Sequence, residues 1–362
     1  MTAQVSAQRN AWATAPGKVI ITGEHAVVYG QPALAAAINR LSTAKVTWHA
    51  NTSLAPGSLS NAAVTLSMPQ MHVQRCLSVA ALKQLAEQIA AKHRDFLAGT
   101  ADLSDLFQQP EDLLLAALGH VINVYALYIE QPLTIELQTD LLLGGGMGSS
   151  ASLVAAILAA FLTACNISFT QQQLVEHVLV AEHWQHGRSS GLDPQVCVQG
   201  GVQSFQQGQA KTLDVVTPGD LYLVTSGRPQ SSTGDCVEAV RQQQHKPEFW
   251  QQFGDLESTV EAVLIDSRVS NKASLIDLLR TNHQLLQSLQ VVPAKVAAFI
   301  AEVEQMGGAG KICGAGSVTG DQGGLLFLAG ITDSQVQGLC TQADYHYWPL
   351  TWHQQGVVYG VN

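Results

Sequence analysis

Residues 142–152 read Leu-Leu-Gly-Gly-Gly-Met-Gly-Ser-Ser-Ala-Ser, and this stretch decides how the fold is interpreted. Its four glycines allow backbone conformations with positive φ and let a ligand approach the main chain. The uncharged apolar run at 153–165 that follows has the length and the composition of a helix. A glycine-rich loop that opens onto a helix N-terminus presents free amide groups and the positive end of the helix dipole. We therefore predict an anion site here, with phosphate as the anion that fits best.

The loop alone also fits a plainer interpretation, a flexible connection in front of a buried helix. It is not a Walker loop, because no Gly-Lys-Ser/Thr follows the glycines. Its glycine spacing also differs from that of the usual dinucleotide fingerprint. Other parts of the chain therefore have to decide between the two interpretations.

Length, composition and charge restrict the class of protein. The 362 residues are enough for two domains, and 46% apolar with 13% charged residues is typical of a globular protein. A net charge of −10 argues against nucleic acid as a partner. An acidic protein that holds a polyphosphate needs local help from amide groups, lysine or a divalent cation.

The cysteines and the apolar segments indicate a cytoplasmic protein without a membrane anchor. Six cysteines lie scattered along the chain without a Cys-x-x-Cys pair, which favours reduced core residues. Residues 1–10 lack the apolar core of a signal peptide. The continuous apolar part of the uncharged segment 141–175 covers only 153–165, shorter than the ~20 residues of a membrane span.

Three polar residues interrupt an apolar segment near the N-terminus. Lys18 precedes the β-branched run 19–21, which predicts a short strand with Lys18 at its mouth. Glu24 and His25 occupy the turn that follows. Taken singly, Lys18 is an ordinary solvated lysine, and Glu24 and His25 are turn residues that bind the local backbone.

A carboxylate lies on the inner face of a predicted helix after the loop. Thr170-x-x-Gln173 has the form of a capping box and opens that helix. Glu182 follows Val178 by four residues and so shares its apolar face. Burial of this carboxylate is costly unless a cation meets it; the alternative is a helix-end glutamate near the surface.

The tetrapeptide Ser190-Gly-Leu-Asp193 is followed by a proline. Pro194 restricts Asp193 to an extended backbone, and we predict a strand over 196–205. An Asp-Pro turn between a helix and a strand is a common structural feature, so the tetrapeptide alone does not indicate a function. Further on, the hydroxyl residues 231–233 fit the N-cap of a helix.

These motifs together resemble a known enzyme family. Residues 15–38, APGKVIITGEHAVVYGQPALAAAI, are similar to the first motif of the mevalonate kinases within the GHMP kinase superfamily. Residues 144–152 resemble the second motif, with leucines at 142–143 in place of the usual prolines and Met147 in place of leucine. Residues 311–316, Lys-Ile-Cys-Gly-Ala-Gly, resemble the third motif, but residues 317–324 intervene before the next strand at 325–328.

The resemblance implies an α+β fold with two domains. The family has an N-terminal domain like domain 2 of ribosomal protein S5 and a ferredoxin-like C-terminal domain, with the active site between them. We place the boundary before the predicted strand 221–224, which gives an N-terminal domain over 1–217 with the ATP-binding loop and a C-terminal domain over 218–362.

The resemblance also implies a role for each matching residue. Asp193 would be the catalytic base, with Lys18 close to it, and Glu182 would bind Mg²⁺ because it precedes Asp193 by the family's 11 positions. Ser150 would complete the metal site, and Glu24, His25, Ser190 and Thr233 would line the acceptor site. The ATP-binding residues implied are Gly144, Gly145, Gly146, Met147, Gly148, Ser149, Ser150, Ala151, Gly314, Ala315 and Gly316.

The implied activity is ATP-dependent phosphorylation of the primary hydroxyl of mevalonate in isoprenoid synthesis, with Mg²⁺ as cofactor. The partners would be ATP and a mevalonate-like small molecule, without nucleic acid or membrane, and a homodimer is left open. Because residues 317–324 depart from the family pattern, a phosphomevalonate kinase or another small-molecule GHMP kinase is an alternative. A non-catalytic ligand sensor is a second class, although a sensor need not keep Lys18, Ser150, Glu182 and Asp193 together.

Overall fold

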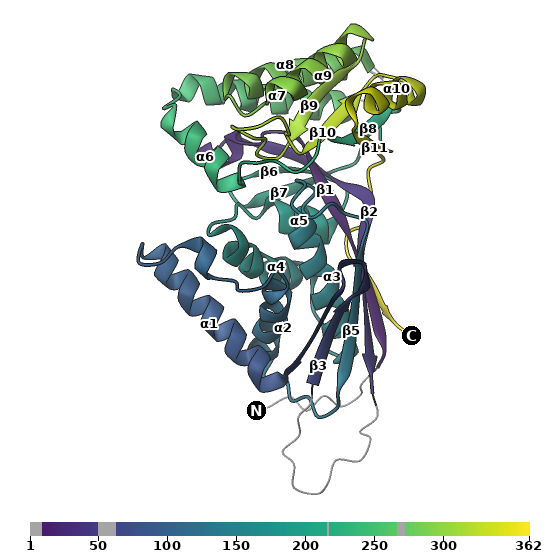
Figure 1. Cartoon of the computed structure of the whole chain (residues 1–362). Helices are drawn as coiled ribbons and strands as arrows, with labels where there is room; N and C mark the ends of the chain where they lie inside the picture. Colours follow the sequence, from purple (N-terminus) through teal and green to yellow (C-terminus); the bar gives the residue numbers. More distant parts are fainter. Residues whose placement is uncertain (1–8, 50–62, 216, 266–271) are drawn as a thin grey trace, which may run out of the picture.

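A computed structural model describes residues 9–49, 63–215, 217–265 and 272–362. Residues 1–8, which carry most of the expectation about a signal segment, lie outside the described ranges. In the described part the chain forms two β-sheets with helices packed against them (Figure 1). This mixed architecture agrees with the predicted α+β fold.

The first sheet has eight strands in the order β12-β1-β2-β5-β3-β4, with β6 on β2 and β7 on β6. The pairing is antiparallel except between β3 and β5. The strands are β1 (Ala11–Thr22), β2 (Ala33–Trp48), β3 (Ala63–Met68), β4 (Val73–Ser78), β5 (Leu133–Thr139), β6 (Val202–Gln206), β7 (Gln209–Leu213) and β12 (Val358–Val361). Because β12 pairs with β1, the end of the chain returns to the first sheet.

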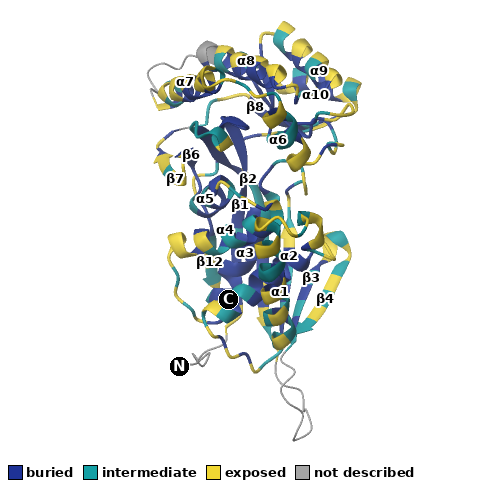
Figure 2. Ribbon diagram, turned by 90° about the vertical axis from the view of Figure 1, so that its left-hand side faces the viewer, coloured by how far each residue is buried: buried dark blue, intermediate teal, exposed yellow. Residues whose placement is uncertain are grey.

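Helices cover one face of the first sheet (Figure 1). They are α1 (Val79–Leu97), α2 (Asp112–Val124), α3 (Ser149–Ala164) and α4 (Gln171–His186), with the short helices η1 (Ala26–Tyr29), η2 (Pro69–Met71) and η3 (Leu103–Asp105) in the connections. The apolar helix α3 is buried along nearly its whole length between the sheet and its neighbours, as its uncharged sequence predicts (Figure 2). Thr170 and Gln173 form the predicted capping box at the start of α4.

The second sheet has four antiparallel strands in the order β11-β8-β10-β9. Its strands are β8 (Leu221–Thr225), β9 (Ala309–Cys313), β10 (Leu325–Ala329) and β11 (His346–Pro349). The helices that accompany them are α6 (Thr233–Gln242), α7 (Pro247–Ile265), α8 (Lys272–Ser288), α9 (Ala294–Gln305) and α10 (Asp333–Ala343). This strand order, with helices between β8 and β9 and between β10 and β11, is the ferredoxin-like arrangement.

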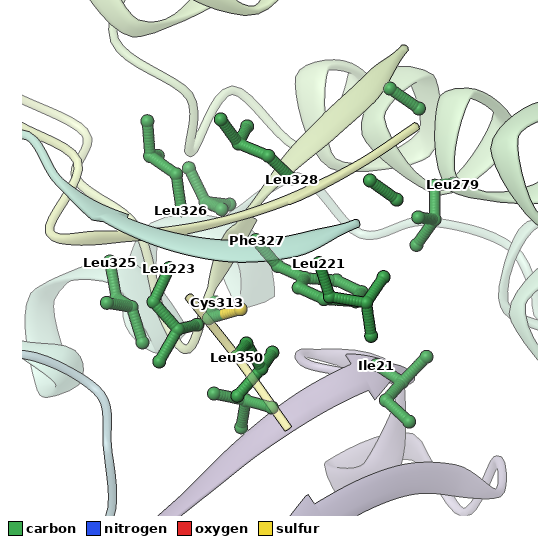
Figure 3. Packing of buried hydrophobic residues seen from close by; sticks show 14 of the residues in the cluster. Ile21, Leu221, Leu223, Leu279, Cys313, Leu325, Leu326, Phe327, Leu328 and Leu350 are labelled. Atoms are coloured by element: carbon green, nitrogen blue, oxygen red, sulfur yellow. The ribbon is translucent and has the colours of Figure 1, made fainter. Parts of the chain in front are cut away.

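A buried hydrophobic cluster connects the two sheets. It contains Ile21 from β1 together with Leu221 from β8, Leu279 from α8 and Phe327 from β10 (Figure 3). Side chains of both sheets are removed from water in the same cluster, so burial holds β1 against the second sheet. The N-terminal motif on β1 therefore lies beside elements that come much later in the chain.

Two local predictions were wrong. The predicted strand over 196–205 is instead the helix α5 (Leu192–Gln199) followed by β6, so Asp193 lies in a first helical turn and its backbone is not extended. Pro194 is tolerated there because the amide groups of a first turn have no intrahelical partner. The strand predicted to begin after Lys18 begins at Ala11, because β1 pairs with β2 along its length, and Lys18 lies inside it.

In the ranges that the structure describes, no helix combines the length and the apolar character needed to cross a bilayer.

Candidate active site

The glycine-rich loop carries the backbone conformations that its sequence predicts. Gly144, Gly146 and Gly148 have positive φ values of 69°, 86° and 64°. Gly148 is the N-cap of α3, and no side chain caps this helix. The first amide groups of α3 therefore have no intrahelical partner and remain available to an anion.

Lys18 and Asp193 form an ion pair directly beneath this loop. Lys18 Nζ lies 3.2 Å from Asp193 Oδ1, and the side chains are 5% and 27% exposed. Burial lowers the pKa of Lys18, but the adjacent Asp193 carboxylate outweighs burial and leaves that pKa raised. A Cβ on Gly148 would lie 2.8 Å from Lys18 Cγ and 3.5 Å from Asp193 Oδ2, so only glycine lets the loop lie this close to the pair.

Glu182 is buried near the same pair and keeps one oxygen free. Its side chain is 1% exposed, and Oε2 lies 3.5 Å from His186 Nε2 one helical turn later. Among the described residues, Glu182 Oε1 has no hydrogen-bond partner. Burial raises the pKa of the Cys197 thiol, and the negative charges of Asp193 and Glu182 raise it further, which places both carboxylates around one side chain. A buried, unpartnered carboxylate oxygen fits a hard divalent cation.

Glu24 and His25 both contact the third glycine motif. The Glu24 carboxylate, 1% exposed, pairs with Lys311 of β9, whose side chain is fully buried. His25 Nε2 lies 3.0 Å from the carbonyl oxygen of Ala315. Burial lowers the pKa of His25, although the Ala315 carbonyl and Glu24 act against that shift, so the ring is neutral and Nε2–H donates to the carbonyl.

A cavity of about 440 Å³ lies between the first and third glycine loops. Its lining comes from both sheets' connections: Gly144, Gly145, Gly146, Arg228, Pro229, Gln230, Ser231, Ser232, Thr233, Cys313, Ala315, Gly316, Gly323 and Gly324. Thr233, Ala315 and Gly316 thus meet the first loop here. Ser190 is not among the lining residues of this cavity; its Oγ accepts a hydrogen bond from Leu192 N at the start of α5.

A smaller, mainly apolar cavity of about 190 Å³ borders the loop and the start of α3. It is lined by Met68, Met71, Val73, Pro110, Glu111, Leu113, Leu114, Leu143, Ser149, Ser150, Leu153 and Gln185. Sequence reasoning missed the contributions of η2 and of the start of α2. Neither carries a chemical motif, and only tertiary packing brings them beside Ser149 and Ser150.

The divergent residues 317–324 form a loop fixed by serine side chains. Ser231 Oγ accepts hydrogen bonds from the amides of Val318 and Thr319, both at 3.2 Å. Ser226 Oγ accepts one from Gly323 N at 3.0 Å. The loop therefore forms an ordered wall of the larger cavity, to which Gly323 and Gly324 contribute.

Comparison of the sequence with known proteins identifies mevalonate kinases as relatives. The family described as "GHMP kinases N terminal domain" matches residues 112–201. A mevalonate kinase from Bos taurus is 31% identical over 245 residues, 60% of this chain and 59% of the relative's length. The mevalonate kinase of Homo sapiens is 26% identical over 362 residues, covering 90% of this chain and 87% of the relative. The mevalonate kinase of Thermococcus sibiricus is 27% identical and covers 84% of this chain and 86% of the relative.

Solved structures share the fold over nearly the whole chain. The mevalonate kinase of Methanococcus jannaschii superposes with a TM-score of 0.76 at 18% identity, covering 96% of this chain and 99% of that protein. The L. major mevalonate kinase in complex with R-mevalonate gives a TM-score of 0.65 at 20% identity, with 94% of each chain covered. A phosphomevalonate kinase from Streptococcus pneumoniae gives 0.66 at 14% identity, covering 94% of this chain and 98% of that one. At these identities the likeness confirms the fold and does not separate the substrates.

Proposed function

We infer that this chain, which belongs to the GHMP kinases, transfers the terminal phosphoryl group of ATP to the primary hydroxyl of mevalonate and produces 5-phosphomevalonate. The observation that carries this proposal is the Lys18–Asp193 pair beneath Gly148, which belongs to a loop whose residues line two cavities, one of them mainly apolar. The mevalonate kinases to which the sequence is similar extend over most of its length, which supports the choice of acceptor.

ATP would occupy both sides of the glycine loop. The smaller cavity is lined by methionine and leucine side chains and suits the flat apolar face of a nucleobase. The phosphates would then follow the amide groups of residues 144–151 at the start of α3, where the helix dipole favours negative charge. The terminal phosphate would also face Gly314, Ala315 and Gly316 of the third glycine motif.

Asp193 would accept the proton of the acceptor hydroxyl as the oxygen attacks phosphorus. Its carboxylate is 27% exposed, so a hydroxyl can reach it, whereas Lys18 behind it is almost fully buried. The Lys18 ammonium lies 3.2 Å from the carboxylate and would stabilise negative charge that develops on the transferred group. Phosphoryl transfer depends mainly on such positioning and charge stabilisation.

Glu182 and Ser150 would hold a magnesium ion, and the free Oε1 of Glu182 supports this choice. When bound, Mg²⁺ would neutralise charge on the phosphates of ATP. Few protein ligands suffice for this ion, because it commonly keeps waters and takes oxygens from the substrate phosphates.

The acceptor would occupy the larger cavity. The Thr233 hydroxyl at the start of α6 and the His25–Ala315 contact lie where a small polar acid with a hydroxyl can be hydrogen-bonded.

The six cysteines are free, as is usual in a reducing compartment. We propose that the reaction takes place in the cytoplasm.

The decisive experiment is ADP release by the purified chain with Mg-ATP and a panel of acceptors. The panel contains mevalonate, phosphomevalonate, several sugars and homoserine, and an Asp193→Asn protein serves as the background control. We expect turnover with mevalonate alone. Turnover with phosphomevalonate or a sugar in its place would show that the 317–324 wall selects another acceptor, and no turnover with any acceptor would favour a ligand sensor.

A further inference from the structure

Lys311 is a lysine in the centre of a buried strand. Its side chain is fully buried, and all five residues of β9 are buried with it. A buried ammonium is costly unless every one of its donors is paired. The sequence could carry an apolar residue here at lower cost, so the role of this charge requires an explanation.

The three donors of Lys311 Nζ are all satisfied, and two of them by the N-terminal motif. Nζ donates to the Glu24 carboxylate, to the carbonyl oxygen of Ile20 at 3.1 Å and to that of Ile312 at 2.8 Å. Ile20 lies on β1, and Glu24 lies in the turn after it. Lys311 thus ties β9 of the second sheet to the N-terminal motif across 287 positions of sequence.

A second contact joins the turn after β1 to the segment that follows β9. Strand β9 leads from Lys311 directly into Ala315, whose carbonyl accepts the hydrogen bond from His25 Nε2. His25 directly follows Glu24 in the turn after β1. The turn and the third glycine loop are therefore held at two neighbouring points.

The same strand end also limits the first glycine loop. A Cβ on Gly146 would lie 2.9 Å from the carbonyl oxygen of Cys313, so the loop and the strand are in close contact. Movement of β9 would change the distance between Ala315 and Gly146, which both line the larger cavity. A shift of Lys311 together with β9 would therefore change the width of that cavity.

The side chains around the Lys311–Glu24 pair are polar, and several of their polar atoms have no hydrogen-bond partner among the described residues. Glu24 Oε2, Asn282 Oδ1 and His283 Nδ1 are buried without a hydrogen-bond partner in the described part of the chain. Asn282 Nδ2 donates to the carbonyl oxygen of Ile21 at 3.1 Å. Packing for stability alone would favour apolar groups here, so the retained polar contacts indicate a constraint from function.

We propose that Lys311 and Glu24 form a positioning pair that fixes His25 against Ala315 at the wall of the acceptor cavity. Glu24 then acts through Lys311 and does not contact the acceptor, in contrast to the role implied by resemblance. This inference rests on the proposed function, because it assigns the pair to the acceptor half of that site.

The test compares four variants of the full chain: Lys311→Met, Glu24→Gln, the two combined, and Lys211→Met. Lys211 pairs with Glu261 at 2.9 Å but is 69% exposed, so the last variant is a matched loss of an accessible ion pair. Each variant is measured for thermal unfolding, for kcat, and for KM toward ATP and toward the acceptor. The ring N–H resonance of His25, identified with a His25→Gln protein, reports the Ala315 hydrogen bond independently of activity.

We expect each single buried change to destabilise the fold, because each leaves one charge unpaired, and the combined change to restore part of the stability. The combined variant should still lose about 10²-fold in kcat, because a misplacement near 1 Å has effects of that size. Its KM for the acceptor should rise while the KM for ATP stays unchanged, and the His25 ring N–H should exchange faster. The Lys211→Met control should leave all these values at wild-type levels.

A folded combined variant with wild-type kcat, acceptor KM and His25 resonance would overturn the proposal and leave the pair a purely structural one. If the combined variant does not fold, Glu24→Gln, which keeps the shape of the side chain, answers the same question with the same readouts. If the wild-type chain turns over no acceptor, the proposed function fails, whereas the His25 resonance still tests the positioning role.

Discussion

The chain contains two lysine–carboxylate pairs with the same chemistry and different surroundings. In Lys18–Asp193 the carboxylate is 27% exposed and lies beneath a flexible glycine, whereas in Lys311–Glu24 the side chains are 0% and 1% exposed. A carboxylate that solvent and substrate can reach is able to exchange a proton during a reaction. A carboxylate enclosed with its lysine cannot, and it can contribute only to geometry and stability.

The comparison shows that residue type does not distinguish the proposed catalytic pair from the proposed positioning pair. Both lysines lie on strands, and both carboxylates come from a turn or a first helical turn near glycines. The exposure of the carboxylate makes the difference. Four experiments test it, and they follow in order of expected effect.

Loss of the accessible carboxylate should remove catalysis and leave folding intact. Asp193→Asn keeps the shape of the side chain but cannot accept the proton, so kcat should fall by roughly 10²–10⁴-fold. The thermal midpoint should change little, and ATP should still bind, as measured by calorimetry. A residual rate near that of the wild type would remove Asp193 from the role of base.

Loss of the enclosed lysine should act mainly on folding. Lys311→Met leaves the Glu24 carboxylate buried and unpaired, so the free energy of unfolding should fall by about 3–5 kcal/mol. Lys18→Met should reduce it much less, because Asp193 is accessible to water. Urea denaturation of both variants measures the difference, and equal losses would contradict the distinction drawn between the pairs.

The buried pair should also make stability depend on pH through its neighbour His283. Burial lowers the pKa of His283 to about 4, and the charge of Lys311 contributes to that shift. The folded-state pKa lies below the unfolded value of about 6.5, so this stability is present above pH 6.5 and is lost as the pH falls toward 4.

Near pH 5 the loss from His283 should be about 2 kcal/mol. His283→Gln should remove this part of the dependence, as seen by comparing unfolding free energies near pH 7.5 and pH 5. The pKa of His120 is also lowered to about 4, by burial and by His177, so that variant keeps a second pH-dependent contribution. An unchanged pH slope in His283→Gln would show that this ring is charged in the folded state.

A loss of stability smaller than that of Lys311→Met should come from the glycine above the accessible pair. Gly148→Ala and Gly208→Ala both place alanine at positive φ, 64° and 81°, which costs about 1–2 kcal/mol. Only at Gly148 does the new Cβ meet another residue, 2.8 Å from Lys18 Cγ, whereas the space at Gly208 is open. The clash adds to the backbone strain, so Gly148→Ala should lose more stability than Gly208→Ala, and kcat should fall only for Gly148→Ala. A wild-type kcat in that variant would mean that the Lys18–Asp193 geometry tolerates displacement.

Features that depend on neighbouring residues could be determined from the sequence alone. The positive φ values of the loop glycines follow from the absence of a Cβ, and the capping box at Thr170 needs only a residue three positions away. The burial of Glu182 follows from its helical spacing, and the family resemblance identified Lys18 and Asp193 as a pair before any distance was known.

Other features depend on contacts between distant segments, and only the tertiary structure decided them. The partner of Glu24 is 287 positions away, and the smaller cavity combines the glycine loop and the start of α3 with three segments that carry no motif. Asp193 was predicted to have an extended backbone because the proline rule is local, whereas Asp193 lies in the first turn of α5, where Pro194 forfeits no intrahelical hydrogen bond. Periodicity and propensity describe how a single segment folds. They do not contain the long-range packing that encloses the Lys311–Glu24 pair and leaves the Asp193 carboxylate partly exposed.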